Sequence, residues 1–157
     1  MDNTNLRVLH PSRARRRAGD IFVAQVRDGE LLFARLISTA AEVFSGVSCN
    51  LLYVYQDTST SESELPALSK ERLLIAPQLL NQKPWTLGYL KRVGHEILGE
   101  DDVLSKHRFR DVSGRLRDEK GTEVGDPAEP CGQFGVGNHR TLDDAISEAL
   151  GIELALD

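Results

Sequence analysis

The clearest pattern of apolar and polar positions lies near the N-terminus, over residues 21–37. Two runs rich in β-branched and aromatic residues, 21–27 and 30–37, flank Asp28-Gly29. This pattern predicts a β-hairpin, and a two-residue Asp-Gly loop is typical of a type I′ turn, in which both central residues have positive φ. Apolar residues occupy both faces of each run, which favours a central position in a sheet or small barrel.

Alternating apolar and polar residues predict further strands after the hairpin. These strands are expected at residues 48–55, 85–93, 109–111 and 115–119. Within 85–93, Trp85 and Tyr89 fall on the same face. Acidic residues at the start of 100–105 indicate a short helical turn, and the frequent Gly and Pro of 121–139 predict a loop region.

The C-terminal segment has the period of an amphipathic helix. Apolar residues recur at three- and four-residue intervals from Leu142 to Leu150, with Thr141 expected as the N-cap and Gly151 as the stop. The sequence therefore predicts an α+β, mostly β fold. We expect an antiparallel twisted sheet, or a small, partly open barrel, built on the N-terminal hairpin with the C-terminal helix packed on it.

The length of 157 residues favours a single domain, assigned to residues 19–157. Residues 1–18 carry five arginines, which would repel one another and bury little, so this segment is predicted to be a flexible basic arm. No apolar run approaches the ~20 residues of a membrane span. We therefore expect a cytoplasmic protein without membrane contact.

Charge is distributed unevenly around the net value of −5: residues 1–17 sum to +4 and residues 96–157 to −8. An acidic half favours a basic partner, although a merely solvated surface is the alternative. Aromatic anchors rimmed by acidic residues are typical of interfaces. The candidate binding residues are Trp85, Tyr89, Glu100, Asp101, Asp102, Asp118 and Glu119. A structural role in the core is the alternative for Trp85 and Tyr89.

Catalytic and metal-binding motifs do not stand out. The sequence has no phosphate-binding loop, no HExxH and no GxSxG, and Cys49 and Cys131 lie in no metal-ligand spacing. We expect both cysteines to be free in a reducing compartment. His95 and His107 could act as an acid–base pair on RNA, but chance placement explains them better. We therefore expect no enzyme activity, no catalytic residues, no metal and no cofactor.

Several segments, taken in order, resemble immunity-protein family 26. They are AGDIF at 18–22 after an arginine-rich lead-in, FARL at 33–36, NQKPW at 81–85 with Gly88-Tyr89, FRD at 109–111 and the helix at 141–151. The resemblance extends over roughly residues 15–152. It implies a cytoplasmic antidote, encoded beside a polymorphic bacterial toxin such as those of contact-dependent inhibition systems, that binds the toxin's C-terminal domain. It transfers no functional residue to this chain.

The resemblance implies a one-to-one complex in which the toxin's active site or substrate face is covered. Because many such toxin domains are basic nucleases, the acidic half would suit one of them. The alternative is a nucleic-acid-binding small β-barrel that uses the arginine arm, although no aromatic residue is interleaved there to stack on bases. Nucleic acid is accordingly not the expected partner. An enzyme with an unrecognised site ranks last.

Overall fold

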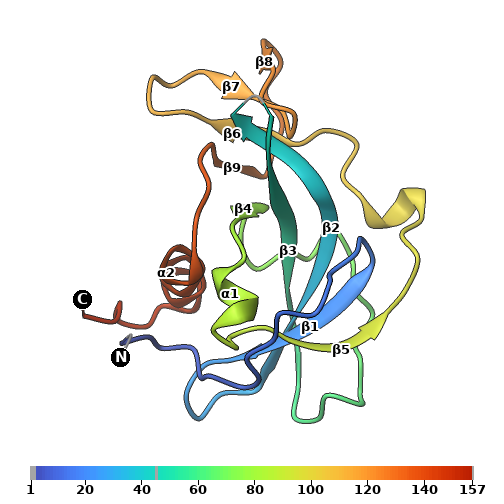
Figure 1. Cartoon of the computed structure of the whole chain (residues 1–157), viewed down its shortest axis with the longest axis vertical. Helices are drawn as coiled ribbons and strands as arrows, with labels where there is room; N and C mark the ends of the chain where they lie inside the picture. Colours follow the sequence, from blue (N-terminus) through green and yellow to red (C-terminus); the bar gives the residue numbers. More distant parts are fainter. Residues whose placement is uncertain (1–2, 45, 157) are drawn as a thin grey trace.

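The computed structural model describes residues 3–44 and 46–156, which form two sheets with helices beside the larger one (Figure 1). The first sheet has the order β4-β3-β2-β1-β5 and the second the order β8-β7-β6-β9. The first contains β1 (Asp20–Gln25), β2 (Leu31–Phe44), β3 (Val47–Ser59), β4 (Gln78–Leu80) and β5 (Lys91–His95). The second contains β6 (Arg108–Arg110), β7 (Leu116–Arg117), β8 (Glu123–Val124) and β9 (Cys131–Gln133).

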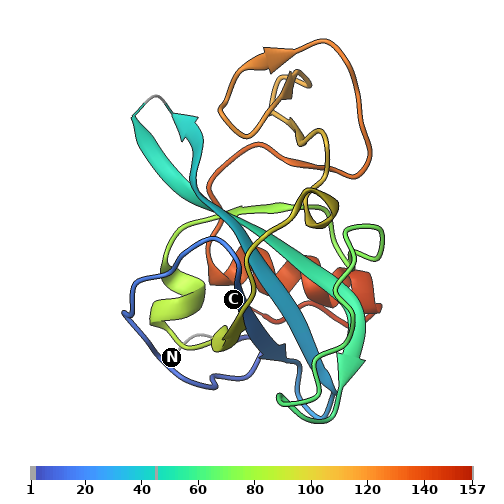
Figure 2. The same ribbon diagram turned by 90° about the vertical axis from the view of Figure 1, so that its right-hand side faces the viewer.

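Three helical elements complete the fold: α1 (Lys83–Thr86), the 3₁₀ turn η1 (Glu100–Asp102) and α2 (His139–Leu150). Figure 2 shows the long hairpin of β2 and β3 crossing the molecule, with the second sheet beside its upper end. The α+β, mostly β prediction is confirmed, in the form of open sheets rather than a closed barrel. The second sheet is mixed, since β6 and β9 run parallel.

The apolar pattern of the hairpin places β1 and β2 in the middle of the first sheet, as expected. One face packs against α1 and α2 through Phe22, Leu36, Leu52, Trp85, Leu142 and Ile146, each at most 2% exposed. Ile37, Leu51, Tyr53 and Phe109 bury the opposite face near the second sheet. Burial on both faces explains why these strands show continuous apolar runs.

The predicted type I′ turn is wrong. The last cross-strand pair is Gln25 with Leu31, which leaves a loop of residues 26–30. Asp28 has a φ of 59°, but Gly29 does not have positive φ. Val26 does not pair with β2; its carbonyl accepts from the Gly29 N–H within the loop, and Val26 bridges to Leu6 of the N-terminal segment.

The predicted strand at 85–93 is also wrong over its first half, because α1 precedes β5. Pro84 occupies the first turn of α1, where its fixed φ suits a helix and its missing N–H is not needed. Gly88 then reverses the chain with a φ of 91°, in a space where a Cβ atom would lie 2.6 Å from the nitrogen of Pro11. The alternation of apolar residues in this segment therefore reflects a helical turn followed by a tight reversal.

The C-terminal helix is confirmed, but it starts earlier than predicted. Asn138, not Thr141, is the N-cap, and its side chain accepts hydrogen bonds from the backbone N–H groups of Arg140 and Thr141. Thr141 is the third helical residue and accepts a return bond from the Asn138 N–H at 3.2 Å. Gly151 ends the helix with a φ of 71°, as expected.

Residues 3–18 lie against the domain, whereas their charge predicted an arm that buries little. Leu6 is only 3% exposed, and the backbone N–H groups of Asn5 and Leu6 donate to the buried Asp143 carboxylate of α2. The Leu9 N–H donates to the Gly88 carbonyl at 2.7 Å. Burial of Leu6 and these main-chain bonds outweigh the repulsion that the arginine count suggests. The division into an arm and a domain stays a prediction.

No helix within the described ranges is long and apolar enough to cross a membrane. Both cysteines are free; Cys49 is buried in β3 and Cys131 is half-buried in β9.

Candidate functional site

A buried carboxylate fixes the start of the first sheet. Asp20, 1% exposed, accepts a hydrogen bond from the Arg17 N–H and contacts the His95 ring nitrogen Nδ1 at 2.9 Å. Arg92 lies 3.5 Å away from the same carboxylate. Asp20 thus joins β1 to the end of β5, at the point where the chain leaves the sheet.

A buried arginine then holds the segment that follows β5. Arg35 of β2 is 2% exposed, and its Nη2 donates to the carbonyls of Glu96 and Ile97 at 2.8 and 3.4 Å. Its Nη1 lies 3.3 Å from the Asp102 carboxylate at the end of η1. One guanidinium therefore binds both ends of residues 96–102, which we call the acidic loop.

Two further contacts fix the acidic loop at its first residue and at η1. The Glu96 N–H donates to the Gly19 carbonyl, and Gly19 has a φ of 97°. A Cβ atom at Gly19 would lie 2.5 Å from the Glu96 oxygen, so only glycine allows this close approach. At the other end, the Asp102 carboxylate accepts from the Gly99 N–H at 2.7 Å.

The acidic loop presents one apolar and several acidic side chains to solvent. Ile97 is 87% exposed, and Glu96, Glu100 and Asp101 are exposed beside it. None of the three carboxylates makes an ion pair with a described residue. The loop therefore combines a fixed backbone with a free, negatively charged surface around a single aliphatic residue.

A chain of hydrogen bonds continues along the same face of the sheet, from Leu104 to Glu119. The Leu104 N–H donates to the Tyr53 hydroxyl at 3.0 Å, and that hydroxyl lies 2.5 Å from Nε2 of His107. The other ring nitrogen of His107 lies 3.5 Å from the Glu119 carboxylate. These directions suit a neutral histidine that accepts from Tyr53 at Nε2 and donates to Glu119 from Nδ1.

Burial shifts the pKa values of Tyr53 and His107 in this series of hydrogen bonds. It raises the pKa of Tyr53 to about 12, against the lowering effect of the Leu104 N–H. Burial also lowers the pKa of His107 from 6.5, with Glu119 raising it and Arg108 lowering it further. Tyr53 and His107 are thus held neutral near pH 7, a state that suits a structural role.

The seven predicted binding residues do not gather at one place. Trp85 and Tyr89 are 2% and 3% exposed, which supports their alternative role in the core. Trp85 packs edge-on against Phe22, and Tyr89 stacks on His139 with ring centroids 5.5 Å apart. Neither can reach a partner in this conformation.

The acidic candidates differ in what they contact. Glu100 and Asp101 are exposed, whereas Asp102 is paired with Arg35. The Asp118 carboxylate accepts from the N–H groups of Lys120 and Thr122, which closes the turn after β7. Glu119 contacts His107. Glu100 and Asp101 therefore remain as the predicted acidic residues with free side chains.

His95 and His107, weighed above as an acid–base pair, are occupied by different partners, Asp20 and the Tyr53–Glu119 chain. Among residues 3–44 and 46–156, no group of three or more His, Cys, Asp and Glu side chains is placed to hold a metal ion.

The sequence did not single out Asp20 and Arg35 as buried charges that hold the end of β5 and the acidic loop, although both lie in the segments that carry the family resemblance. A signal was present: a charged residue inside an apolar strand is rarely buried without a partner. The partners could not be read from the sequence, because Arg35 binds residues that lie about sixty positions further along the chain.

Comparison with known proteins identifies the chain by one match. A family model described as immunity protein 26 matches residues 17–119. No curated protein and no solved structure shows a match. The matched residues run from the turn before β1 to the end of the Tyr53–His107–Glu119 chain, so they include Asp20, Arg35 and the whole acidic loop. The match spans well over half of the sequence, and the chain belongs to the immunity protein 26 family.

Proposed function

We propose that this protein binds and neutralises the C-terminal domain of a cognate toxin. The observation that carries this proposal is the family match over residues 17–119. The protein forms a one-to-one complex and covers the toxin's active site or substrate face, acting as a binding protein and not as an enzyme. It acts in the cytoplasm, where an incoming toxin domain would reach its target.

The acidic loop is the surface that we propose for toxin contact. Ile97 supplies an aliphatic anchor, and Glu96, Glu100 and Asp101 supply the charged rim that interfaces commonly have. Negative charge there suits a basic toxin such as a nuclease, because complementary fields speed association and select the partner.

The rigid attachment of the acidic loop favours tight binding. Arg35, Gly19 and Asp102 fix its backbone before any partner arrives. A loop that is already ordered loses little conformational freedom on binding, so more of the contact energy appears as affinity. Slow dissociation follows from such preorganisation, as an antidote requires.

The test uses the toxin domain encoded by the neighbouring upstream gene, if that gene specifies a large secreted protein with a variable C-terminal domain. We expect the two proteins to co-purify and the immunity protein to rescue growth of cells that express the toxin domain. The double substitution Glu100→Lys/Asp101→Lys should weaken binding at least about tenfold. Most of the loss should appear as slower association, and added salt should reduce the difference.

A matched control reverses two exposed acidic residues elsewhere, Glu148→Lys/Glu153→Lys, with the same change in net charge. This control should bind within about twofold of the wild type. Equal binding by all three proteins would reject the acidic loop as the contact surface. Absence of a complex with the adjacent toxin domain would reject the proposed function itself.

A further inference from the structure

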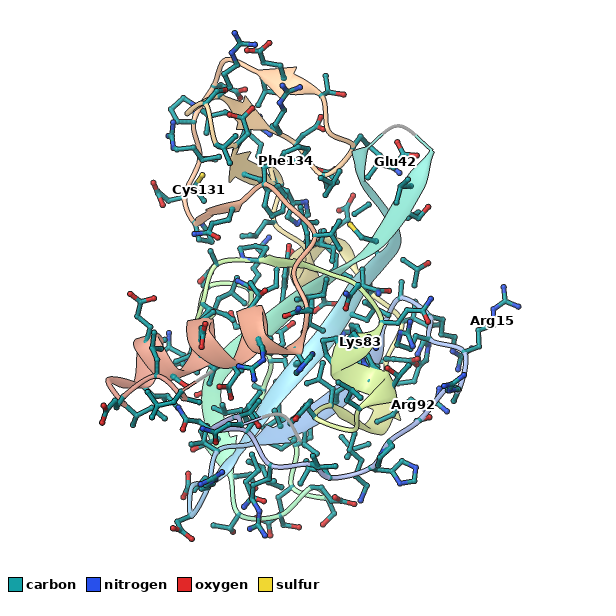
Figure 3. The ribbon with its side chains drawn as sticks, turned by 60° about the vertical axis from the view of Figure 1, so that its left-hand side comes forward. Arg15, Glu42, Lys83, Arg92, Cys131 and Phe134 are labelled. Atoms are coloured by element: carbon teal, nitrogen blue, oxygen red, sulfur yellow. The ribbon has the colours of Figure 1, made fainter. Side chains whose placement is uncertain are left out.

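A basic face lies on the first sheet, away from the second sheet. We define it by Arg13, Arg15 and Arg16 of the N-terminal segment, Lys83 of α1 and Arg92 of β5. Figure 3 shows Arg15, Lys83 and Arg92 on the same side of the molecule, with Cys131 and Phe134 far from them. The N-terminal segment is fastened there, because the Ser12 N–H donates to the Trp85 carbonyl at 3.1 Å.

The basic face is hollowed. Three cavities of about 270, 470 and 560 Å³ open there, and Arg16 lines all of them. No acidic side chain lines any of the three, although the protein as a whole carries a net charge of −5. Polar side chains without charge supply much of the remaining lining, among them Gln82 and Thr86.

Most of these cations are not neutralised within the protein. Arg13, Arg15 and Lys83 are exposed and make no ion pair with any described residue. Arg92 lies near the buried Asp20 carboxylate, which also contacts His95, and the Arg92 side chain remains 47% exposed. By contrast, the basic residues of the second sheet are largely paired, as Arg108 is with Asp126 and Arg117 with Asp111. The basic face therefore has an excess of positive charge that a partner can neutralise.

Arg16 is held differently from the others. Its guanidinium carbon lies 4.5 Å from the centre of the Trp85 ring, and its Nε is buried without a hydrogen-bond partner among the described residues. Burial lowers the pKa of Arg16 from its ordinary value, and the nearby Asp20 opposes that change. A cation stacked on an indole is well ordered, so it can meet an anion at little entropic cost.

We propose that the basic face binds the phosphodiester backbone of single-stranded nucleic acid. Arginine and lysine side chains spread over adjoining hollows suit a polyanion that runs through them, with amide and hydroxyl groups available to phosphate and sugar oxygens. Trp85 lies beneath Arg16, so it is not free to stack on a base. Binding is therefore carried by phosphate contacts, which do not depend on the base sequence.

An acidic protein surface is the other partner that would match the charge. A protein interface is usually built around exposed aromatic or large aliphatic anchors. The large apolar side chains that line the cavities, such as Phe22, Trp85 and Leu90, are at most 2% exposed. Val47 and Val136, which are 50% and 39% exposed, are the exceptions among these large side chains. This lining favours a backbone of phosphates over a folded partner.

The test measures binding of the full chain to a fluorescently labelled 20-nucleotide poly(U) RNA by fluorescence anisotropy, at several salt concentrations. The variant Arg13→Glu/Lys83→Glu changes two exposed, unpaired side chains. We expect it to bind at least about tenfold more weakly at low salt. The slope of log affinity against log salt should become shallower by about 1.4, which is the loss of two phosphate contacts at about 0.7 each.

The control Arg115→Glu/Lys120→Glu makes the same change in net charge on the second sheet, and we expect it to bind RNA like the wild type. Equal weakening by both double variants would overturn the proposal, because net charge alone would then explain binding. Absence of RNA binding at low salt would also overturn it. Competition by poly-glutamate as effective as by RNA, at equal charge concentration, would replace it with an acidic protein partner. Each of these results is independent of toxin neutralisation, which the co-purification measures.

Discussion

The two sheets are held together by different forces. The first sheet buries two apolar clusters, one against α1 and α2 and the other on its opposite face. The second sheet has strands of two or three residues, and Phe109 is its large, fully buried side chain. Ion pairs supply much of its remaining contact: Lys106 and Arg108 with Asp126, Arg117 with Asp111, and Arg115 with Glu123.

Because of this difference, pH and salt should affect the stability of the second sheet more than that of the first. Apolar burial is insensitive to proton concentration, whereas ion pairs and buried histidines are not. The segment between β5 and β6, residues 96–107, connects the two regions, and we call it the joint. It is attached by Arg35 at one end and by His107 at the other. Substitutions at the joint should therefore affect more of the molecule than substitutions inside the second sheet.

The largest effect is expected from Arg35→Met. Methionine keeps the apolar stem but removes the donors to the Glu96 and Ile97 carbonyls and the partner of Asp102. Breaking a buried pair by removing one member is costly, but Asp102 is 30% exposed and stays partly hydrated. We expect a loss of about 2 kcal/mol in the free energy of unfolding, measured by urea denaturation.

The same variant should release the acidic loop. Backbone amides of residues 96–102 should exchange hydrogen faster, whereas those of β2 and β3 should change only in step with global stability. The conservative substitution Arg35→Lys keeps a charge but not the forked donors, so it should restore part of the stability and little of the loop protection. Unchanged exchange in the loop of Arg35→Met would show that other contacts hold it.

The first region was largely predictable from the sequence, because apolar periodicity is a local signal. The hairpin, the third strand and the amphipathic helix each follow from residues that lie close together in the chain. The segment at 85–93 was predicted wrongly as one strand, since an apolar alternation can arise from a helical turn and a reversal as well as from a strand. Pro84 was the residue that distinguished the two.

The joint and the candidate site were far less predictable. The two short strands of 109–119 were expected, but nothing local indicates that β9 pairs in parallel with β6. Likewise, the acidic residues of the second half appeared as a free charged surface, whereas the structure pairs Asp102 with the distant Arg35, and pairs Asp111, Glu123 and Asp126 with arginines of the second sheet or beside it. Long-range pairing of charges leaves no periodic trace, so a charge count overestimates the free acidic surface.

An intermediate effect is expected from pH, through His107. Its ring faces Tyr53 and Glu119, with Arg108 adjacent, and burial lowers its pKa from 6.5. Below pH 6.5 the unfolded chain binds a proton at this residue that the folded chain does not. Stability should therefore fall as the pH drops below 6.5 towards the pKa of the folded state, and it should be fully present above 6.5.

The comparison with His107→Gln isolates this effect from the other histidines. Glutamine can still hydrogen-bond Tyr53, but it does not titrate. Urea midpoints at pH 7.5, 6.5 and 5.5 should fall more steeply in the wild type than in the variant. Parallel curves for the two proteins would mean that His107 does not govern the acid sensitivity of the joint.

The smallest effect is expected inside the second sheet, from Asp126→Asn. The Asp126 carboxylate binds Lys106 and Arg108, which holds its pKa at about 2, but it is half exposed and its pairs are screened by water. Arg108 also keeps its bond to the Asp126 carbonyl in the variant. We expect an unchanged urea midpoint, with hydrogen exchange in β7 and β8 faster by a few-fold.

Asp57→Asn provides the matched substitution in the first sheet. It removes an ion pair that is also open to solvent, from Asp57 of β3 to Arg72 at 3.0 Å, in which the Arg72 side chain is 56% exposed and the Asp57 side chain 26%. Apolar contacts on both faces hold β3, so its exchange should not change. Equal acceleration of hydrogen exchange in β3 and in β7–β8 would contradict the distinction between the two sheets. A surface ion pair would then protect the backbone as much over an apolar core as it does in the sheet that relies on charged contacts.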